Sequence, residues 1–297
     1  MNAREQGFLL LTSHLGNPVR KPLTMAQFRN LAQAVLGQET PKWDRELMAE
    51  DLLSMGYDPA TAKRIVDLLE EEELLAEYLQ TGKRHGCQCV SRVNPQYPLR
   101  LRKRMGLDAP GCLWAKGDIS LLTMPAVALV GSRELGIVNE AFAAEVGEQA
   151  AKQGYALVSG NAKGADTVAQ ESALYHGGCV ISVVADALQA HSQRERVLYL
   201  AEGDYDTPFS AQRALSRNRI IHSLGAMTFV AQCTKGKGGS WDGSLKNLKH
   251  GYSPLFVLDD GSAGAEALLD MGAEPIKPER LQDLSAIKPY IQRLTDQ

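Results

Sequence analysis

Four segments in the second half of the chain, three of them with glycines, carry side chains that are suited to binding an anion. Glycine lets a backbone come close to a ligand, lysine and arginine supply positive charge, and a guanidinium can hold a phosphate bidentately or stack on a base. The four segments therefore predict phosphate binding. Their chemistry-bearing residues are Gly131, Ser132 and Arg133; Ser159, Gly160, Lys163, Gly164 and Asp166; Arg217, Asn218 and Arg219; and Lys235, Lys237, Gly238, Gly239 and Ser240.

Several of these residues leave a structural alternative open. Asp166 either contributes to the anion site or caps its own helix. Trp241, directly after the fourth segment, either stacks on a base or anchors the next helix in the core. Arg217 and Arg219 flank Asn218, and we expect the two guanidinium groups to project together; surface salt bridges are the alternative. The residue pattern predicts no catalytic group.

The distribution of charge indicates a polyanionic ligand. The formal net charge of the chain is −3, which taken alone does not indicate a nucleic-acid binder. Residues 207–251, however, contain seven Lys or Arg against one acid, and local charge sets the field that a polyanion meets. A second basic window, residues 92–104, has five Lys or Arg and no acid. It predicts either a phosphate-contacting edge or a solvated helix.

Composition excludes several classes of protein. With 44% hydrophobic and 23% charged residues, the chain is typical of a soluble globular protein. No apolar run approaches the roughly 18–20 residues needed to span a bilayer, so we expect no membrane association. The five cysteines are scattered, and only Cys87 and Cys89 lie close together. This usage predicts free thiols in the cytoplasm and no metal site. We also expect no cofactor.

Strands and helices alternate from residue 126 onward. Predicted strands cover 127–130, 156–159, 180–184, 227–231, 255–258 and 274–276, and predicted helices cover 139–153, 165–175, 210–223, 243–250 and 264–271. This rhythm predicts an α/β fold with a Rossmann-like, doubly wound, mostly parallel sheet. Because the carboxyl ends of parallel strands meet at one edge, we expect the four segments to lie together there.

The rest of the chain has a different character. Residues 1–80 are predicted to form a small helical domain, with a long helix over 60–78. A glycine-containing turn before that helix resembles those of helix-hairpin-helix or SAM-like modules; a plain helical bundle is the alternative. Residues 81–120 are predicted to be a linker or extension leading into the sheet, residues 121–277 the Rossmann-like DNA-binding domain, and residues 278–297 a helical tail.

Taken together, the segments resemble the DNA-processing protein A (DprA/Smf) family of the Rossmann-like SLOG superfamily. The resemblance is carried by VALVGSR (127–133), SGNAKGAD (159–166), HGGCVISVVA (176–185), SRNRII (216–221) and GGS (238–240). It implies a single-stranded DNA-binding protein of recombination and natural transformation, a homodimer, and the RecA recombinase as a partner. It also implies a positively charged DNA pocket lined by Ser132, Arg133, Lys163, Gly164, Arg217, Asn218, Gly239 and Ser240.

The chain departs from the family pattern at several places, among them a longer, more basic glycine loop that includes Trp241 and Asp242, and Asp259-Asp260-Gly261 in place of the usual proline-glycine. Gln170 stands where a histidine is usual, and Gln232 stands where an acid is usual. The alternative function is a nucleotide enzyme of the LOG type, a phosphoribohydrolase, for which Asp242 would supply the carboxylate. A nucleotide sensor in phage defence is a third hypothesis.

Overall fold

One nine-stranded sheet forms the centre of the molecule in the computed structural model, which describes residues 1–37 and 47–289. The strand order is β1-β2-β6-β5-β4-β3-β7-β8-β9. All neighbouring pairs from β6 to β9 are parallel, whereas β1 and β2 are antiparallel additions at one edge. The strands are β1 (Cys87–Ser91), β2 (Cys112–Lys116), β3 (Ala126–Val130), β4 (Ala156–Ser159), β5 (Cys179–Val184), β6 (Val197–Glu202), β7 (Thr228–Val230), β8 (Leu255–Leu258) and β9 (Glu274–Ile276).

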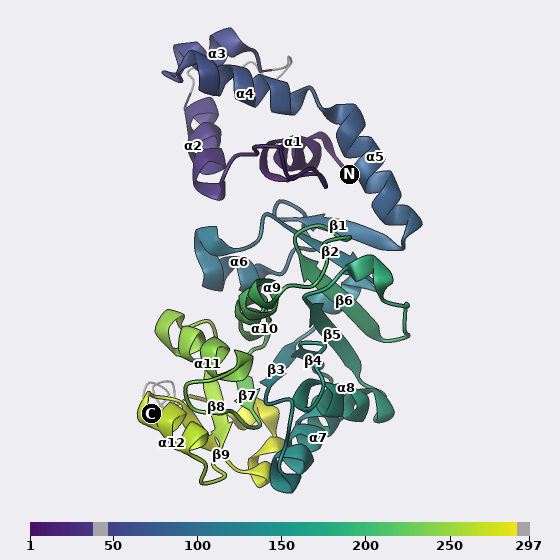
Figure 1. Cartoon of the computed structure of the whole chain (residues 1–297), viewed down its shortest axis with the longest axis vertical. Coiled ribbons are helices and arrows are strands. Elements are labelled where there is room, and N and C mark those ends of the chain that lie inside the picture. The colour runs from purple at the N-terminus through teal and green to yellow at the C-terminus, as the bar shows by residue number, and fades with distance from the viewer. Residues whose placement is uncertain (38–46, 290–297) are drawn as a thin grey trace.

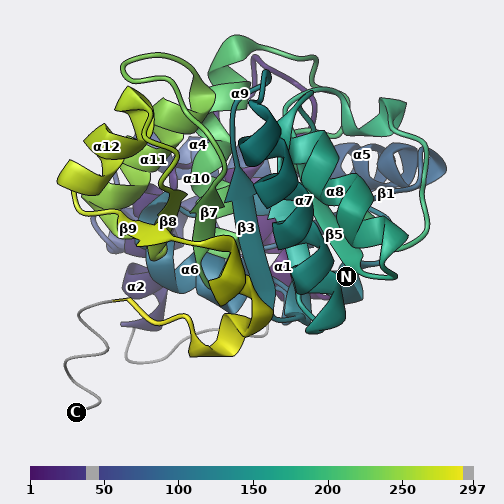
Figure 2. The same ribbon diagram turned by 90° about the horizontal axis from the view of Figure 1, so that it is seen from below.

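Helices cover both faces of this sheet, so the predicted doubly wound α/β fold is confirmed (Figure 1). On one face α7 (Ile137–Lys152) packs against α8 (Ala165–Tyr175), and Figure 2 shows these two helices side by side. The other face is covered by α6 (Leu99–Met105), α10 (Asn218–Leu224), α11 (Gly239–His250) and α12 (Ala263–Asp270).

The central strand β3 explains why an apolar run without alternation forms a strand here. Ala126, Ala128 and Val130 face the core on the α10 side, and Val127 and Leu129 face the core on the α7 side. All five residues are buried. A strand buried on both faces needs apolar side chains at every position, which is typical of a parallel sheet.

The chain reverses its direction of travel across the sheet between β3 and β7. From β3 the chain moves through β4 and β5 to β6, and it then returns to the other side of β3 to form β7, β8 and β9. At such a switch point the loops after the two adjacent strands diverge and leave a crevice, where open α/β sheets bind ligands.

The N-terminal helices pack on the β1–β2 edge of the sheet (Figure 1). They are α1 (Ala3–Thr12), α2 (Met25–Leu36), α3 (Ala49–Ser54), α4 (Pro59–Leu69) and α5 (Glu72–Arg84). Trp114 of β2 is fully buried and contacts Tyr78 of α5 and Tyr205 edge-on. An aromatic cluster therefore joins the helices to the sheet.

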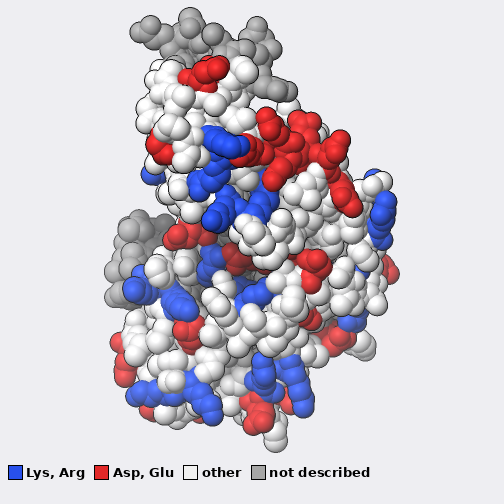
Figure 3. Space-filling model, turned by 45° about the horizontal axis from the view of Figure 1, so that its top comes forward, with Lys and Arg blue, Asp and Glu red and all other residues white. Residues whose placement is uncertain are grey.

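Acidic side chains gather over the part of the surface that holds α4 and α5 (Figure 3). The run Glu70–Glu73 lies at the junction of these two helices, and three of its four members are exposed. Arg20 is buried beside it and pairs with Glu71, with Nε 2.6 Å from Oε2. The remaining acids form a solvated surface.

Sequence analysis differs from the structure in two strands and two helices. It predicts neither β2 nor β6. The predicted helix 210–223 is two helices, α9 (Ala211–Ser216) and α10, which meet at Arg217. The predicted helix 60–78 is divided into α4 and α5, because Arg20 Nη2 binds the Leu68 carbonyl at the end of α4 and Nε binds Glu71.

The described part of the predicted helical tail contains two short 3-10 helices, Pro278–Gln282 and Leu284–Ala286. Residues 38–46 of the predicted N-terminal domain and 290–297 of the tail lie outside the described residues. No helix within residues 1–37 and 47–289 is long and apolar enough to cross a bilayer.

Two helical glycines give a matched test of the packing between α5 and the sheet. A Cβ on Gly82 would lie 2.5 Å from Cζ3 of Trp114, whereas a Cβ on Gly7 of α1 would meet nothing within 4 Å. We expect Gly82→Ala to lower the free energy of unfolding by about 1–3 kcal/mol through overpacking. Gly7→Ala should raise it by up to about 1 kcal/mol, because alanine is the better helix former. Urea unfolding measures both, and equal effects would contradict the contact.

Candidate functional site

A pocket of about 650 Å³ lies at the switch point, where β3 and β7 end. All four predicted segments contribute to its lining. The segment 159–166 does so only through Ala162 and Asp166. Its lining includes Gly131, Ser132, Arg133, Glu134, Ala162, Asp166, Phe209, Leu215, Arg217, Asn218, Gln232, Lys237, Gly238, Gly239 and Ser240. The predicted convergence of the segments at one edge of the sheet is therefore what the fold produces.

Glycine is required where two of the loops come into contact. A Cβ on Gly131 would lie 2.4 Å from the Cβ of Ala165, and a Cβ on Gly164 would lie 2.5 Å from the Ser132 carbonyl oxygen. Gly164 also has φ +89°, a conformation that side chains rarely adopt. The loop after β3 and the loop after β4 thus pack backbone to backbone, which brings the N-terminus of α8 to the pocket.

The guanidinium of Arg217 is buried beneath this pocket. Its Nη1 donates to the Val183 carbonyl at 2.5 Å, and its Nη2 lies 4.0 Å from Oδ2 of Asp166. A Cβ on Gly160 would lie 1.9 Å from Nη1, so only glycine leaves room for this side chain. Burial lowers the pKa of Arg217 from its ordinary value, and its Nε has no hydrogen-bond partner within the described residues.

Asp166 is a buried counter-ion rather than a helix cap. It occupies the second residue of α8, and its Oδ2 accepts from the Ala162 amide at 3.2 Å. Burial raises the pKa of Asp166 to about 6, while Arg217, the Ala162 amide and Arg133 each act to lower it. The carboxylate therefore lies within electrostatic reach of both arginines that line the pocket.

Side-chain amides hold the remaining walls in place. Nδ2 of Asn218 donates to the Gly239 carbonyl at 2.9 Å, which ties α10 to the start of α11. Oε1 of Gln232 accepts from the Gly136 amide at 2.9 Å and so supports the loop after β3. Gln170 donates to Oγ of Ser159 at 2.7 Å beneath the second loop. Gln232 and Gln170 thus both support loops that form the pocket.

Exposed cations and an aromatic ring surround the pocket opening. Arg133 and Lys237 line the pocket and are exposed, and Phe209, which also lines it, is 58% exposed. Lys163 and Lys235 are exposed on the same loops but do not line the pocket. Two helices, α8 and α11, begin at its walls, and free amides at helix N-termini favour anions.

Six predicted contact residues do not line the pocket: Ser159, Gly160, Lys163, Gly164, Arg219 and Lys235. Ser159 and Gly160 are buried under the Arg217 guanidinium and support the pocket from beneath. Arg219 points away from it, with Nη2 paired to Glu202 and Nη1 donating to the Asp108 carbonyl at 2.5 Å. The expectation that Arg217 and Arg219 project together is wrong, because residues two apart in a helix lie on nearly opposite sides.

Other parts of the sequence analysis are resolved by packing. Trp241 belongs to the hydrophobic core, so the core alternative is correct for it. Lys246 pairs with Asp242 at 2.8 Å, which neutralises part of the positive charge of residues 207–251. Glu134 and Gln232 line the pocket although sequence analysis did not select them; a polar residue directly after a buried strand is the signal that could have found Gln232.

No group of His, Cys, Asp or Glu able to hold a metal ion is found within the residues that the structure describes. The pocket offers exposed cations, loop amides and an exposed ring, and it places them at the switch point of a doubly wound sheet. Fold and site together define a Rossmann-like protein with a cation-lined crevice at the switch point of its sheet. The chain belongs to the family of DNA recombination-mediator protein A, whose family model matches residues 88–286.

Curated relatives agree with this assignment. DNA processing protein DprA of Bacillus subtilis (strain 168) is 26% identical over 217 residues, which are 68% of this chain and 72% of the relative. DprA of Streptococcus pneumoniae is 31% identical over 182 residues, or 56% of this chain and 64% of the relative. Protein Smf of Escherichia coli K12 is 30% identical over 182 residues, which span 48% of that protein.

Solved structures share the fold. The X-ray structure of DprA from Streptococcus pneumoniae superposes with a TM-score of 0.70 at 24% identity, covering 97% of this chain and 99% of that one. The structure of DNA processing protein A from Helicobacter pylori, described for its single-stranded DNA binding mode, gives a TM-score of 0.56 at 24% identity, with coverages of 71% and 96%.

Asp166 predicts a pH dependence of stability. Its pKa in the folded protein, about 6, lies above the ordinary value of 3.8, so the proton is bound more tightly in the folded state. The stabilisation that this proton provides is present below pH 4 and is lost as the pH rises through 6. From pH 4.5 to 7.5, Asp166→Asn should therefore gain stability relative to the wild type, on the order of 1–3 kcal/mol.

Urea unfolding at the two pH values measures this difference. Asp118→Asn is the control, because Asp118 is exposed and its pKa is lowered by hydrogen bonds to Ser120, so it is ionised throughout this range. A stability difference for Asp166→Asn that stays constant between the two pH values would refute the assignment.

Proposed function

We propose that this protein binds single-stranded DNA in the switch-point pocket and acts without catalysis in DNA processing and recombination, as in natural transformation. The observation that carries the proposal is the convergence of Arg133, Arg217 and Lys237 at the pocket, with two helix N-termini in its walls. Membership of the DNA recombination-mediator protein A family supports a nucleic-acid ligand over other polyanions.

Each part of the pocket has a role in this proposal. The exposed guanidinium of Arg133 and the amine of Lys237 bind backbone phosphates, and the amides of Gly238–Ser240 donate to phosphate oxygens. Lys163 and Lys235, exposed beside the pocket, extend the positive track along the strand. The exposed ring of Phe209 stacks on a base, which favours unpaired strands because duplex bases are already stacked.

Arg217 and Asp166 prepare the site from beneath. The buried Arg217 fixes the ends of β5 and the loop after β4, and Asp166 balances the charges of Arg133 and Arg217 while no phosphate is bound. The proposed role of Arg217 is thus partly structural, and Arg133 is the residue whose removal tests phosphate binding without disturbing the core.

A LOG-type hydrolase is the alternative and needs a carboxylate beside the glycine-rich loop. Asp242 occupies the first turn of α11, is paired with Lys246, and is not among the residues that line the pocket. The carboxylates in the lining are Glu134 and the buried Asp166. This placement favours binding over hydrolysis.

A homodimer and a partnership with the RecA recombinase complete the proposal. Both are what the resemblance to the DprA/Smf family implies. Size-exclusion chromatography with light scattering tests the first, and loading of RecA onto strands bound by this protein tests the second.

A fluorescence-anisotropy titration distinguishes the candidate functions. We expect the protein to bind a labelled oligo-dT strand more tightly than the matching duplex, and AMP to compete weakly. Binding should weaken steeply with salt, because phosphate contacts release counterions. Release of adenine from AMP without affinity for oligo-dT would overturn the proposal in favour of the hydrolase.

Arg133→Ala tests the phosphate contact. The variant should bind oligo-dT more weakly whatever the sequence, and the slope of log K against log salt should flatten by about 0.7 for each phosphate that the variant no longer neutralises. Arg102→Ala, an exposed arginine on α6, is the control and should leave the slope unchanged. An unaltered slope for Arg133→Ala would remove Arg133 from the site.

A further inference from the structure

A second pocket of about 640 Å³ lies on the α6 side of the sheet, toward the ends at which the parallel strands begin. Ala126, the first residue of β3, and Ile181 of β5 form its floor, and Leu224 at the end of α10 adjoins them. The switch-point pocket lies at the other ends of these strands, where β3 and β7 finish. The described residues that line one pocket are all different from those that line the other.

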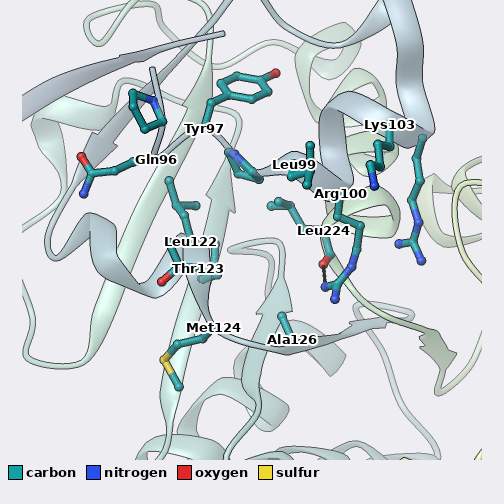
Figure 4. A pocket seen from close by; sticks show the side chains of 14 residues that line it. Gln96, Tyr97, Leu99, Arg100, Lys103, Leu122, Thr123, Met124, Ala126 and Leu224 are labelled. Atoms are coloured by element: carbon teal, nitrogen blue, oxygen red, sulfur yellow. Dashed lines mark hydrogen bonds between the residues drawn. The ribbon is translucent and has the colours of Figure 1, made fainter. Parts of the chain in front are cut away.

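Three cations on one side of this pocket face no acid among the residues that the structure describes. Arg100, Lys103 and Arg104 belong to α6, and the described lining of the pocket contains no carboxylate (Figure 4). Arg100 Nη1 donates to the Leu224 carbonyl at 2.8 Å, and Arg104 Nη2 donates to the Ala226 carbonyl at 3.1 Å. Carbonyl groups thus fix the two guanidinium groups without neutralising their charge.

Desolvation makes this arrangement costly. Burial lowers the pKa of Arg100, and burial together with the neighbouring charge of Arg100 lowers the pKa of Arg104 to about 10. Two like charges that are partly removed from water repel each other unless an anion lies beside them. The helix C-terminus of α10 offers only partial negative charge.

The side opposite α6 is largely apolar. Leu122 and Met124 lie across the pocket from the α6 side chains, with Thr123 between them and Gln96 nearby (Figure 4). Ala126 and Ile181 of the sheet complete the lining. Leu99 is 51% exposed at its edge. A single anionic group on a hydrocarbon or aromatic body matches both sides.

We propose that this pocket is a binding site for a small organic anion, with one carboxylate or phosphate group bound by Arg100 and Lys103 and an apolar body lying on Leu122, Met124 and Ile181. The site is separate from the proposed DNA pocket, so it can be occupied while DNA is bound.

The fluorescent probe 8-anilinonaphthalene-1-sulfonate tests the site, because it combines one anionic group with an aromatic body. We expect saturable binding to the full-length protein with increased fluorescence. Lys103→Glu should weaken binding about tenfold, since it places a negative charge beside the sulfonate. Met124→Glu should also weaken probe binding, because it places a negative charge on the side of the pocket that faces α6. Circular dichroism and thermal unfolding establish that both variants are folded.

Arg102→Glu is the matched control, because Arg102 makes the same charge change on the same helix but does not line the pocket. It should leave probe affinity within about twofold. Equal affinity of Lys103→Glu and the wild type would overturn the proposal, as would equal losses in Lys103→Glu and Arg102→Glu.

Displacement identifies the anion. Loss of probe fluorescence on adding octanoate indicates a carboxylate ligand, and loss on adding phenyl phosphate indicates a phosphate ligand; either supports the proposal. Displacement by oligo-dT instead would make this pocket part of the nucleic-acid path and overturn it. The readout does not depend on DNA affinity, so failure here is distinguishable from failure of the proposed function.

Discussion

The buried guanidinium of Arg217 is the interaction on which the carboxyl edge of the sheet depends. It joins the end of β5, through the Val183 carbonyl, to Asp166 at the start of α8, and it occupies the space that a side chain on Gly160 would fill. It is also the residue at which α9 ends and α10 begins. One cation therefore sets the positions of three segments that are far apart in the sequence, and the pocket is formed above it.

Much of the sheet could be predicted because its strands are buried on both faces. Short apolar runs such as 126–130 and 255–258 permit one interpretation when glycine turns and helical periods follow them. The pattern failed at β2 and β6, which contain a tryptophan or a tyrosine and are joined by pairing between segments about 85 residues apart. Local sequence carries no signal for such long-range pairing.

The candidate site divides in the same way. Glycines and cations next to strand ends, such as Gly131 and Arg133, could be placed from the order of elements alone. Sequence alone could not predict which of the cations remain unpaired, because that depends on acids elsewhere in the chain. Glu202 forms an ion pair with Arg219, and Asp166 lies beside Arg217. The role of Asp166 was likewise hidden, since its environment is set by burial under a neighbouring loop and not by its position in a helix.

The aromatic cluster around Trp114 has a consequence for how the molecule responds to stress. Tyr78 from the helical region, Trp114 from β2 and Tyr205 from the loop after β6 share one core, which α1 also completes through Phe8 and Leu9. Separating the N-terminal helices from the sheet would expose these aromatic rings to water, which is unfavourable. The helices and the sheet are therefore thermodynamically coupled. Damage at the N-terminus therefore lowers the population of the whole native state.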